Sequence, residues 1–293
     1  MTVTEMIGRI KTVLTSNKNQ ERNDAADRFA RGPKIPFSDG YTEFKEKLLT
    51  QVLADPGLMH TFRAGGPIPP GFGARLDERI VEYPWVLSRL SGSQGLILDA
   101  GSTFNKPALL STEFLNGRRI LVYTLETDWI RYDPRVSYIF GDLRQMILRD
   151  GVAATIACIS TLEHVGFTYE YKTYSKRKPW PHAQPQSYLD AIREFRRVLG
   201  PGGHLLLTVP FGAYEDHGWL QQFDAAMVEK VKATFAGETC AETYYRYVDG
   251  GWTTSSAPDC AGLSYFNVHE TGAFEEDGLA AARAVCCLDL RVG

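Results

Sequence analysis

The stretch Gly95–Asn105, GLILDAGSTFN, decides the fold. Its apolar residues run into Asp99, and Gly101 and Ser102 follow where a buried strand has to turn. A short apolar run bounded by Gly and Ser is typical of a strand buried on both faces of a parallel sheet. Glycine permits a tight turn and lets a ligand approach the main chain. We predict a strand over 96–100 and a ligand-binding turn after it; an ordinary strand and turn is the alternative.

Composition restricts the class of protein. The chain has 293 residues, 44% of them hydrophobic, which is enough for a large core. A formal net charge of −3 disfavours a nucleic-acid partner. Charges interrupt the N-terminal apolar positions, and no stretch approaches the roughly 20 apolar residues of a membrane span. We expect a cytoplasmic protein without a membrane span. The five cysteines are scattered without CxxC spacing, so we expect neither a disulfide framework nor a metal site.

Residues 1–90 are predicted to form a helical appendage that helps to cover the acceptor. Apolar residues at helical spacing predict one helix near 7–14 and another near 44–52, which Asp55-Pro56-Gly57 ends. The Gly- and Pro-rich segment 62–79 predicts a structured loop. Residues 79–90 predict a short helix after Pro84.

From Gly95 onward, strands and helices alternate, which implies a doubly wound, mostly parallel α/β sheet. Strands are predicted at 96–100, 119–125, 136–140, 152–160, 204–209, 240–248 and 284–290. Helices are predicted at 107–115, 187–199 and 218–235. The prediction is therefore a seven-stranded sheet with an antiparallel last strand. It forms a domain over 91–293 with inserts at 166–187 and 249–282.

Glycines and carboxylates gather at the predicted carboxyl ends of the strands, the edge where such sheets bind ligands. They occur in four motifs, LILDAGSTFN, YIFGDLRQM, CISTLEHVG and EFRRVLGPGGHLLLTVPFG. In this order the motifs resemble those of class I S-adenosylmethionine-dependent methyltransferases over residues 95–212. The variant loop GSTFN, STLEHVG and the later EDHGWLQQFD together resemble a bacterial branch associated with modification of sugars, surface polysaccharides or natural products. The resemblance implies a Rossmann-like fold, S-adenosylmethionine as cofactor and S-adenosylhomocysteine as product.

The resemblance also implies a role for each matching residue. Asp99, Gly101 and Ser102 would lie along the methionine and ribose, Glu126 would hold the ribose hydroxyls, Asp142 and Leu143 would meet the adenine, and Ser160 would contact the methionine. Two departures matter. Thr103-Phe104-Asn105 replaces the usual third glycine, so Asn105 is predicted to offer a polar side chain to the cofactor carboxylate. Glu126 lies further along the chain from Asp99 than the family pattern implies. Asp128 is therefore the alternative ribose-binding acid, and Glu126 could simply be a solvated residue at the end of a strand.

Methyl transfer from a sulfonium depends mostly on positioning, but a hydroxyl acceptor benefits from a general base. We predict His217 as this base, because Glu215 and Asp216 adjoin it and histidine titrates near neutral pH. His164, with Glu163, is the second candidate. A helix cap or pocket wall is the plain interpretation of Glu163 and His164, and a surface loop that of His217. Consecutive positions 215–217 make a metal site less favoured.

Two long segments are predicted to lie over the acceptor. The insert at 166–187 combines Tyr169, Tyr171, Tyr174 and Trp180 with four basic residues, which would suit a nucleotide sugar. An exposed basic loop is the alternative, and an RNA or DNA acceptor is disfavoured. The second segment contains Trp252, Tyr265, Phe266 and His269 within 249–282. Connections this long are usually functional or mobile.

Three classes of function remain. The favoured one is methyl transfer to a small or medium polar acceptor, above all an oxygen of a sugar or secondary metabolite, with N-methylation of a small-molecule amine as the alternative. A non-catalytic protein that keeps the S-adenosylmethionine fold is the second. An NAD-dependent oxidoreductase is the third, disfavoured because GxGxxG is absent after the first strand. The sequence leaves open whether the chain forms a homo-oligomer.

Overall fold

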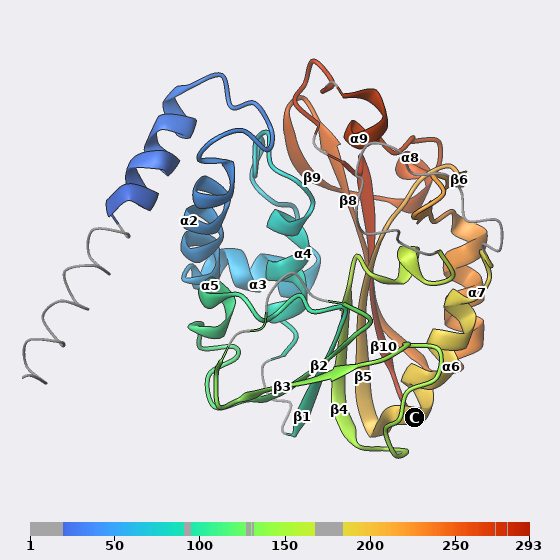
Figure 1. Cartoon of the computed structure of the whole chain (residues 1–293). Helices are drawn as coiled ribbons and strands as arrows, with labels where there is room; N and C mark the ends of the chain where they lie inside the picture. The colour runs from blue at the N-terminus through green and yellow to red at the C-terminus, as the bar shows by residue number, and fades with distance from the viewer. Residues whose placement is uncertain are drawn as a thin grey trace, which may run out of the picture.

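The computed structural model describes residues 20–90, 95–126, 130, 132–167, 184–272, 274–279 and 281–293, without the side chains of 269 and 270. An eight-stranded mixed sheet runs through the centre of this part of the chain (Figure 1). Among these residues no helix has both the length and the apolar character to cross a bilayer.

The sheet has the order β3-β2-β1-β4-β5-β10-β8-β9. Its strands are β1 (Leu96–Ala100), β2 (Arg119–Thr124), β3 (Val136–Phe140), β4 (Ala153–Ile159), β5 (Leu199–Pro210), β8 (Glu238–Val248), β9 (Gly251–Ser255) and β10 (Ala284–Arg291). The first five are mutually parallel, and β10 pairs antiparallel with β5. A mostly parallel sheet with an antiparallel last strand is therefore confirmed.

Helices cover both faces of this sheet (Figure 1). On one face of the sheet, strand residues form a hydrophobic core with four helices, α2 (Tyr41–Leu53), α3 (Pro56–Ala64), α4 (Arg79–Leu87) and α5 (Pro107–Leu110). The other joins the opposite strand faces to α6 (Tyr188–Val198) and α7 (Ala225–Phe235). Side chains alternate between faces along a strand. Ile97 accordingly packs in the first core and Leu98 in the second.

The strand order reverses at β1. The chain passes from β1 to β2 on one side and later returns to β4 on the other. Ligands of doubly wound sheets bind outside the carboxyl ends of the strands at such a switch point. The turns after β1 and β4 therefore lie at the position where doubly wound sheets bind ligands.

The predicted count of seven strands is wrong, because β9 adds an eighth. Asp249 and Gly250 have φ angles of +52° and +79° and connect β8 to β9. Two positive φ angles are typical of the two-residue turns that match strand twist, and Asp-Gly favours them. The segment 249–282 therefore begins as a hairpin before α8 (Ala257–Cys260) and α9 (Val268–Thr271). Consequently β10 lies inside the sheet, while β9 forms its edge.

The predicted helix over 218–235 is also wrong in its first third. Residues Gln221–Gln222 form β7, which pairs with β6 (Glu215–Asp216) as a small hairpin. Helix α7 begins only after Asp224, whose side chain accepts a 2.8 Å hydrogen bond from the Met227 amide. Such an N-cap satisfies an amide that has no partner within the helix.

The N-terminal part differs from prediction at its prolines. Asp55 caps α3, and Pro56 occupies its first turn, where a missing amide costs nothing. Helix α4 starts at Arg79 and contains Pro84 instead of following it. A further helix includes residues 20–31.

Several predictions fall outside the described residues. They concern the helix near 7–14, Asp128, and the aromatic and basic residues of the insert between 168 and 183. The side chain of His269 is likewise not described.

Candidate functional site at the carboxyl edge of the sheet

Asp99 organises the turn after β1. Its carboxylate accepts hydrogen bonds from the Thr103 amide (2.9 Å), the Thr103 hydroxyl (2.8 Å) and the Phe104 amide (2.7 Å). Burial raises the pKa of Asp99, and these three donors oppose that shift. The side chain is fully buried, so it shapes the loop from beneath.

The turn itself has an unusual backbone. Gly101 has φ +114°, and a Cβ there would lie 2.1 Å from the Thr161 hydroxyl in the segment after β4. Ser102 has φ +67°, which is uncommon for a residue other than glycine. Glycine therefore allows the turns after β1 and β4 to touch. Strained residues of this kind cluster at functional sites.

Asn105 closes the same loop. Its amide nitrogen donates a 2.9 Å hydrogen bond to the Ser102 hydroxyl, and its side chain is 1% exposed. The side chain that replaces the usual third glycine thus braces the turn from within. Whether it also contacts the cofactor carboxylate stays a prediction.

The acids after β2 and β3 differ in their surroundings. Glu126 is exposed just beyond the end of β2. Asp142 is paired with Arg144, with 2.6 Å between carboxylate and guanidinium. Partial burial alone would raise the pKa of Asp142, but its hydrogen bonds to Arg144 lower it. Leu143 is buried beside this pair.

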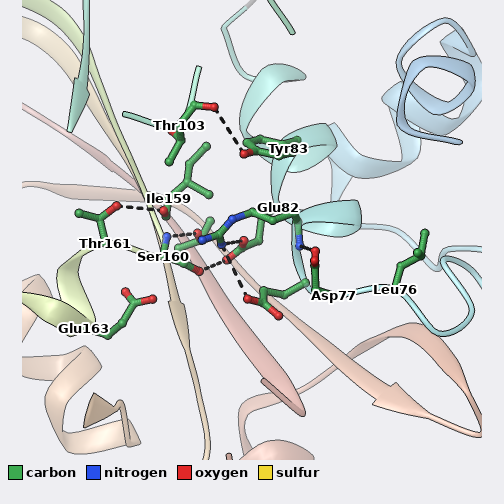
Figure 2. Close-up of polar contacts among 12 residues, drawn as sticks. Leu76, Asp77, Glu82, Tyr83, Thr103, Ile159, Ser160, Thr161 and Glu163 are labelled. Atoms are coloured by element: carbon green, nitrogen blue, oxygen red, sulfur yellow. Dashed lines mark hydrogen bonds and ion pairs between the residues drawn. The ribbon is translucent and has the colours of Figure 1, made fainter. Parts of the chain in front are cut away.

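Ser160 joins the end of β4 to helix α4. Its hydroxyl donates a 2.6 Å hydrogen bond to Glu82 (Figure 2). Glu82 also forms an ion pair with Arg79. Glu82 is fully buried. Burial would lower the pKa of Arg79, but Glu82 and Glu78 raise it, so the guanidinium stays charged. Ser160 itself has φ +38°.

A cavity of about 170 Å³ lies beside this contact. It is lined by Glu78, Arg79, Ser160, Glu163, His164, Pro210, Trp219, Leu220 and Tyr265. Helix α4, the ends of β4 and β5, the hairpin and the segment before α9 all contribute. Predicted site residues Ser160, Glu163 and His164 are therefore brought together at one cavity.

Among the carboxyl groups of the lining, that of Glu163 is buried, and Glu78 has one buried oxygen although its side chain is 13% exposed. Burial is the main cause that raises the pKa of Glu163 well above its usual value, and Glu82 and Glu78 add to it. Burial followed by Asp77 raises the pKa of Glu78 to about 7. Glu163 lies next to Ser160 in Figure 2 and is 3% exposed.

His164 is oriented by the hairpin. Its Nδ1 lies 2.9 Å from the Trp219 carbonyl, and the two rings stack. Because a carbonyl only accepts, Nδ1 carries the hydrogen and Nε2 is the basic nitrogen of the neutral ring. That Nε2 lies 3.9 Å from the Glu163 carboxylate. This separation is longer than a hydrogen bond.

His217 lies in the turn between β6 and β7. Its Nε2 is 3.2 Å from the Glu215 carboxylate, which also accepts a 2.9 Å hydrogen bond from the Tyr265 amide. The His217 and Tyr265 rings are 5.1 Å apart. Within the described residues, His217 adjoins a wall of the cavity but is not one of its lining residues.

Sequence reasoning assigned no role to Glu78, Arg79 or Glu82. The available signal was charge at 78, 79 and 82 next to the apolar run IVEYPWVL. Fully buried Glu and Arg are rare unless paired. Glu82 is fully buried, and Glu78 and Arg79 are partly buried next to it, so the three residues form a polar cluster at the start of an apolar helix.

A second polar group lies away from this edge. His204 of β5, Cys240 of β8 and Asp289 of β10 place ligand atoms within 4.8 Å of one another. His204 already bonds Asp289 at 2.6 Å, which accounts for both side chains without an ion.

Comparisons with known proteins find similar chains among solved structures. No family model and no curated protein matches the chain. Among solved structures, a SAM-dependent methyltransferase from Methanosarcina mazei is 11% identical with a TM-score of 0.44, covering 71% of this chain and 97% of its own. The S-adenosylhomocysteine complex of Burkholderia thailandensis 1,6-didemethyltoxoflavin N1-methyltransferase is 11% identical (TM-score 0.43; 97% and 89% covered). The S-adenosylhomocysteine complex of N-methyltransferase NodS from Bradyrhizobium japonicum is 13% identical (TM-score 0.39; 85% and 98%).

Proposed function

We propose that this chain transfers a methyl group from S-adenosylmethionine to a small or medium polar acceptor. The observation that carries the proposal is the position of the cavity. It lies at the ends of β4 and β5, next to the strained turn of Gly101 and Ser102 at the switch point. Cofactor and acceptor would thus bind side by side along one edge of the sheet.

The residues at β1 to β3 suit the cofactor. The exposed carboxylate of Glu126 has two oxygens that can accept both ribose hydroxyls. Gly101 and Ser102 would present main chain to the methionine. Leu143 and the paired Asp142 would border the adenine. Asp99, Asn105 and Ser160 would act mainly by holding the turns, since each already has a partner within the protein.

The residues at the cavity suit proton removal from an acceptor. When bound, S-adenosylmethionine supplies an electrophilic methyl group, so the protein has to orient the acceptor and take its proton. Glu163 and the Nε2 of His164, which are 3.9 Å apart at the cavity, would take this proton. His217, predicted as base from the sequence, would act from the neighbouring turn past Tyr265.

The acceptor atom distinguishes two versions of this proposal. The sequence favours an oxygen of a sugar or secondary metabolite, with an amine nitrogen as the alternative. A protein that binds the cofactor without turnover is a further candidate. An NAD-dependent oxidoreductase is the least favoured.

Ligand-induced thermal stabilisation tests the cofactor. A ligand that binds only the native state raises its apparent stability. We expect S-adenosylmethionine and S-adenosylhomocysteine to raise the Tm by several degrees at 1 mM, and NADH to leave it unchanged. Absence of a shift with S-adenosylhomocysteine, or a shift with NADH alone, contradicts the proposal.

Turnover separates an enzyme from a binding protein. Transfer of labelled methyl from S-adenosylmethionine is followed with matched pairs that differ in one group: glucosamine and glucose, benzylamine and benzyl alcohol. Methylation of either member supports the enzyme. Cofactor binding without transfer to an extended acceptor panel supports the non-catalytic alternative.

A further inference from the structure

Two carboxyl groups at the cavity have oxygens that the protein does not satisfy. Glu78 Oε2 and Glu163 Oε2 are buried and have no hydrogen-bond partner among the described residues. Both residues line the 170 Å³ cavity. An unsatisfied buried polar group costs about 1–3 kcal/mol, and more if it is charged. Such a cost calls for an explanation, and a ligand that donates to both oxygens from the cavity is one that fits their position.

The nearby cation does not supply it. The Arg79 guanidinium pairs with Glu82 and lies 3.9 Å from the other oxygen of Glu78. Glu82 is also bonded to Ser160. Arg79 is thus the one cation near three acids, Glu78, Glu82 and Glu163, among the residues that line or adjoin this cavity in the described part of the chain, and no donor reaches Glu78 Oε2 or Glu163 Oε2.

We propose that the acceptor is a basic amine whose ammonium group is held by Glu78 and Glu163. This inference rests on the proposed methyl transfer and names its substrate class. Burial favours the protonated form of both groups in the empty cavity, whereas a bound cation favours the ionised form, which only accepts hydrogen bonds from its ligand. An ammonium offers several donors and a charge, whereas a hydroxyl offers one donor and none. The rings of Trp219 and Tyr265 in the same lining also suit a cation.

The position of the carboxyl groups favours the acceptor over the cofactor's own amino group. The lining includes the ends of β4 and β5 but neither Gly101 nor Glu126. A volume of 170 Å³ equals about five or six waters at liquid density. It accommodates an amine head group, while the remainder of the acceptor would extend outside.

The chemical step is balanced within this site. The ammonium gives one N–H proton to the carboxylate of Glu163, which leaves a lone pair on nitrogen. This lone pair forms the new N–C bond to the methyl carbon while the C–S bond breaks and its electron pair stays on sulfur. The product keeps one positive charge as the N-methylated ammonium. Glu163 would then pass this proton to His164 Nε2, which is 3.9 Å away, after a small movement of either side chain.

Methylammonium chloride is a minimal probe of the site. The protein saturated with S-adenosylhomocysteine is heated with 50 mM methylammonium chloride, with KCl at equal ionic strength, and with 50 mM methanol. We expect a rise in Tm of about 2 °C with methylammonium relative to KCl, and none with methanol. Glu163→Gln and Glu78→Gln, which keep side-chain shape, should each abolish the rise. Glu113→Gln, at an exposed position, should keep it.

Three results would overturn the inference. One is no shift, or an equal shift with methanol. Another is retention of the shift in both Glu→Gln variants. The third is competition, in which methylammonium raises the Kd of S-adenosylhomocysteine in proportion to its concentration; the carboxyl groups would then hold the cofactor's amino group.

The same experiment separates failure of the inference from failure of the proposed function. If S-adenosylhomocysteine does not bind, the methyltransferase proposal fails, and methylammonium is tested on the protein alone. If S-adenosylhomocysteine binds and turnover occurs, the matched amine and alcohol acceptors decide whether the acceptor is an amine. Transfer to benzylamine or glucosamine at a rate at least tenfold above the matching alcohol supports the inference, and the reverse preference contradicts it.

Discussion

The Ser160 hydroxyl lies 2.6 Å from the Glu82 carboxylate, which ties the end of β4 to a helix 78 positions earlier in the chain. Both partners are buried, and Arg79 binds the second oxygen of Glu82. Helix α4 is therefore joined to the functional edge through polar contacts as well as through apolar packing. Any change at Ser160 should be felt at both places.

Ser160→Ala should lower the free energy of unfolding by about 1.5–3 kcal/mol. It removes a hydrogen bond to a buried carboxylate and leaves one oxygen of Glu82 without a partner. Alanine tolerates φ +38° about as poorly as serine, so backbone strain should not change. Urea unfolding measures the loss. Ser111→Ala, whose hydroxyl is exposed, should change stability by less than about 0.5 kcal/mol. Equal stability of the two variants would count against the link.

Gly101→Ala should separate the turns after β1 and β4. Its Cβ would lie 2.1 Å from the Thr161 hydroxyl at φ +114°, so clash and strain together should cost about 3 kcal/mol. Gly117→Ala is the matched control, because φ is also positive at +69° but no atom lies within 4 Å. It should cost only about 1 kcal/mol.

Chemical unfolding and S-adenosylhomocysteine titration test this pair of variants. We expect cofactor affinity to fall at least tenfold in Gly101→Ala and to stay constant in Gly117→Ala. Thr161→Ala should partly rescue Gly101→Ala, because residues in contact are coupled. Additive effects of the two substitutions would show that the clash is not the cause.

Glu126→Ala should lower the affinity for the cofactor without lowering the stability of the fold. The side chain is exposed, so the free energy of unfolding should change by less than about 0.5 kcal/mol. Loss of two hydrogen bonds from a charged acceptor should raise the Kd of S-adenosylhomocysteine by about tenfold or more. Calorimetric titration measures the Kd, with Glu113→Ala as control. An unchanged Kd would assign the ribose to another residue.

The parallel half of the sheet could be predicted because its signals are local. Strand β3 spans Val136–Phe140 as predicted, and β1 and β4 agree closely, since apolar runs bounded by turn residues identify buried strands. The helix over 218–235 misled because Trp219, Leu220 and Phe223 also have helical spacing. Pairing of Gln221 and Gln222 with β6 is a non-local interaction that periodicity does not contain.

The site could be predicted only where it follows strand ends. Ser160, Glu163 and His164 come directly after β4, so topology places them at the edge. Glu78 precedes β1 and reaches the cavity through the packing of α4 against the sheet, which also brings Glu82 to Ser160. That packing depends on tertiary contacts. The Asp249-Gly250 turn, in contrast, was a readable hairpin signal within a segment taken to be a loop.

Glu78→Gln should flatten the pH dependence of stability. In the folded protein burial, then Asp77, raises the pKa of Glu78 to about 7, whereas the unfolded value is 4.5; Arg79 opposes the shift and Glu82 adds to it. Between these pH values only the folded state keeps the proton, so the free energy of unfolding falls as pH rises. The difference amounts to about 3 kcal/mol.

Unfolding at pH 4.5 and pH 7.5 measures this contribution. The pKa of Glu163 is also raised, so both acids contribute to the slope of stability against pH in the wild type. The difference in slope between the wild type and Glu78→Gln gives the contribution of Glu78. Asp142 and Asp277, with lowered pKa values, lose their stabilising effect only below this range. Glu113→Gln should follow the wild type. Parallel curves for Glu78→Gln and wild type would contradict the prediction.

The two histidines can be distinguished by variants that keep one ring hydrogen bond each. The amide of His164→Asn can replace Nδ1 as donor to the Trp219 carbonyl, and that of His217→Gln can replace Nε2 toward Glu215. We expect kcat to fall about 100-fold in His164→Asn, because the variant lacks the His164 Nε2 that faces Glu163 at the cavity. His217→Gln should change kcat less than threefold if it supports Tyr265, whereas a comparable 100-fold loss would identify His217 as the base. The assay uses whichever matched acceptor turns over, and an unchanged Kd for S-adenosylhomocysteine shows that either loss concerns the acceptor side.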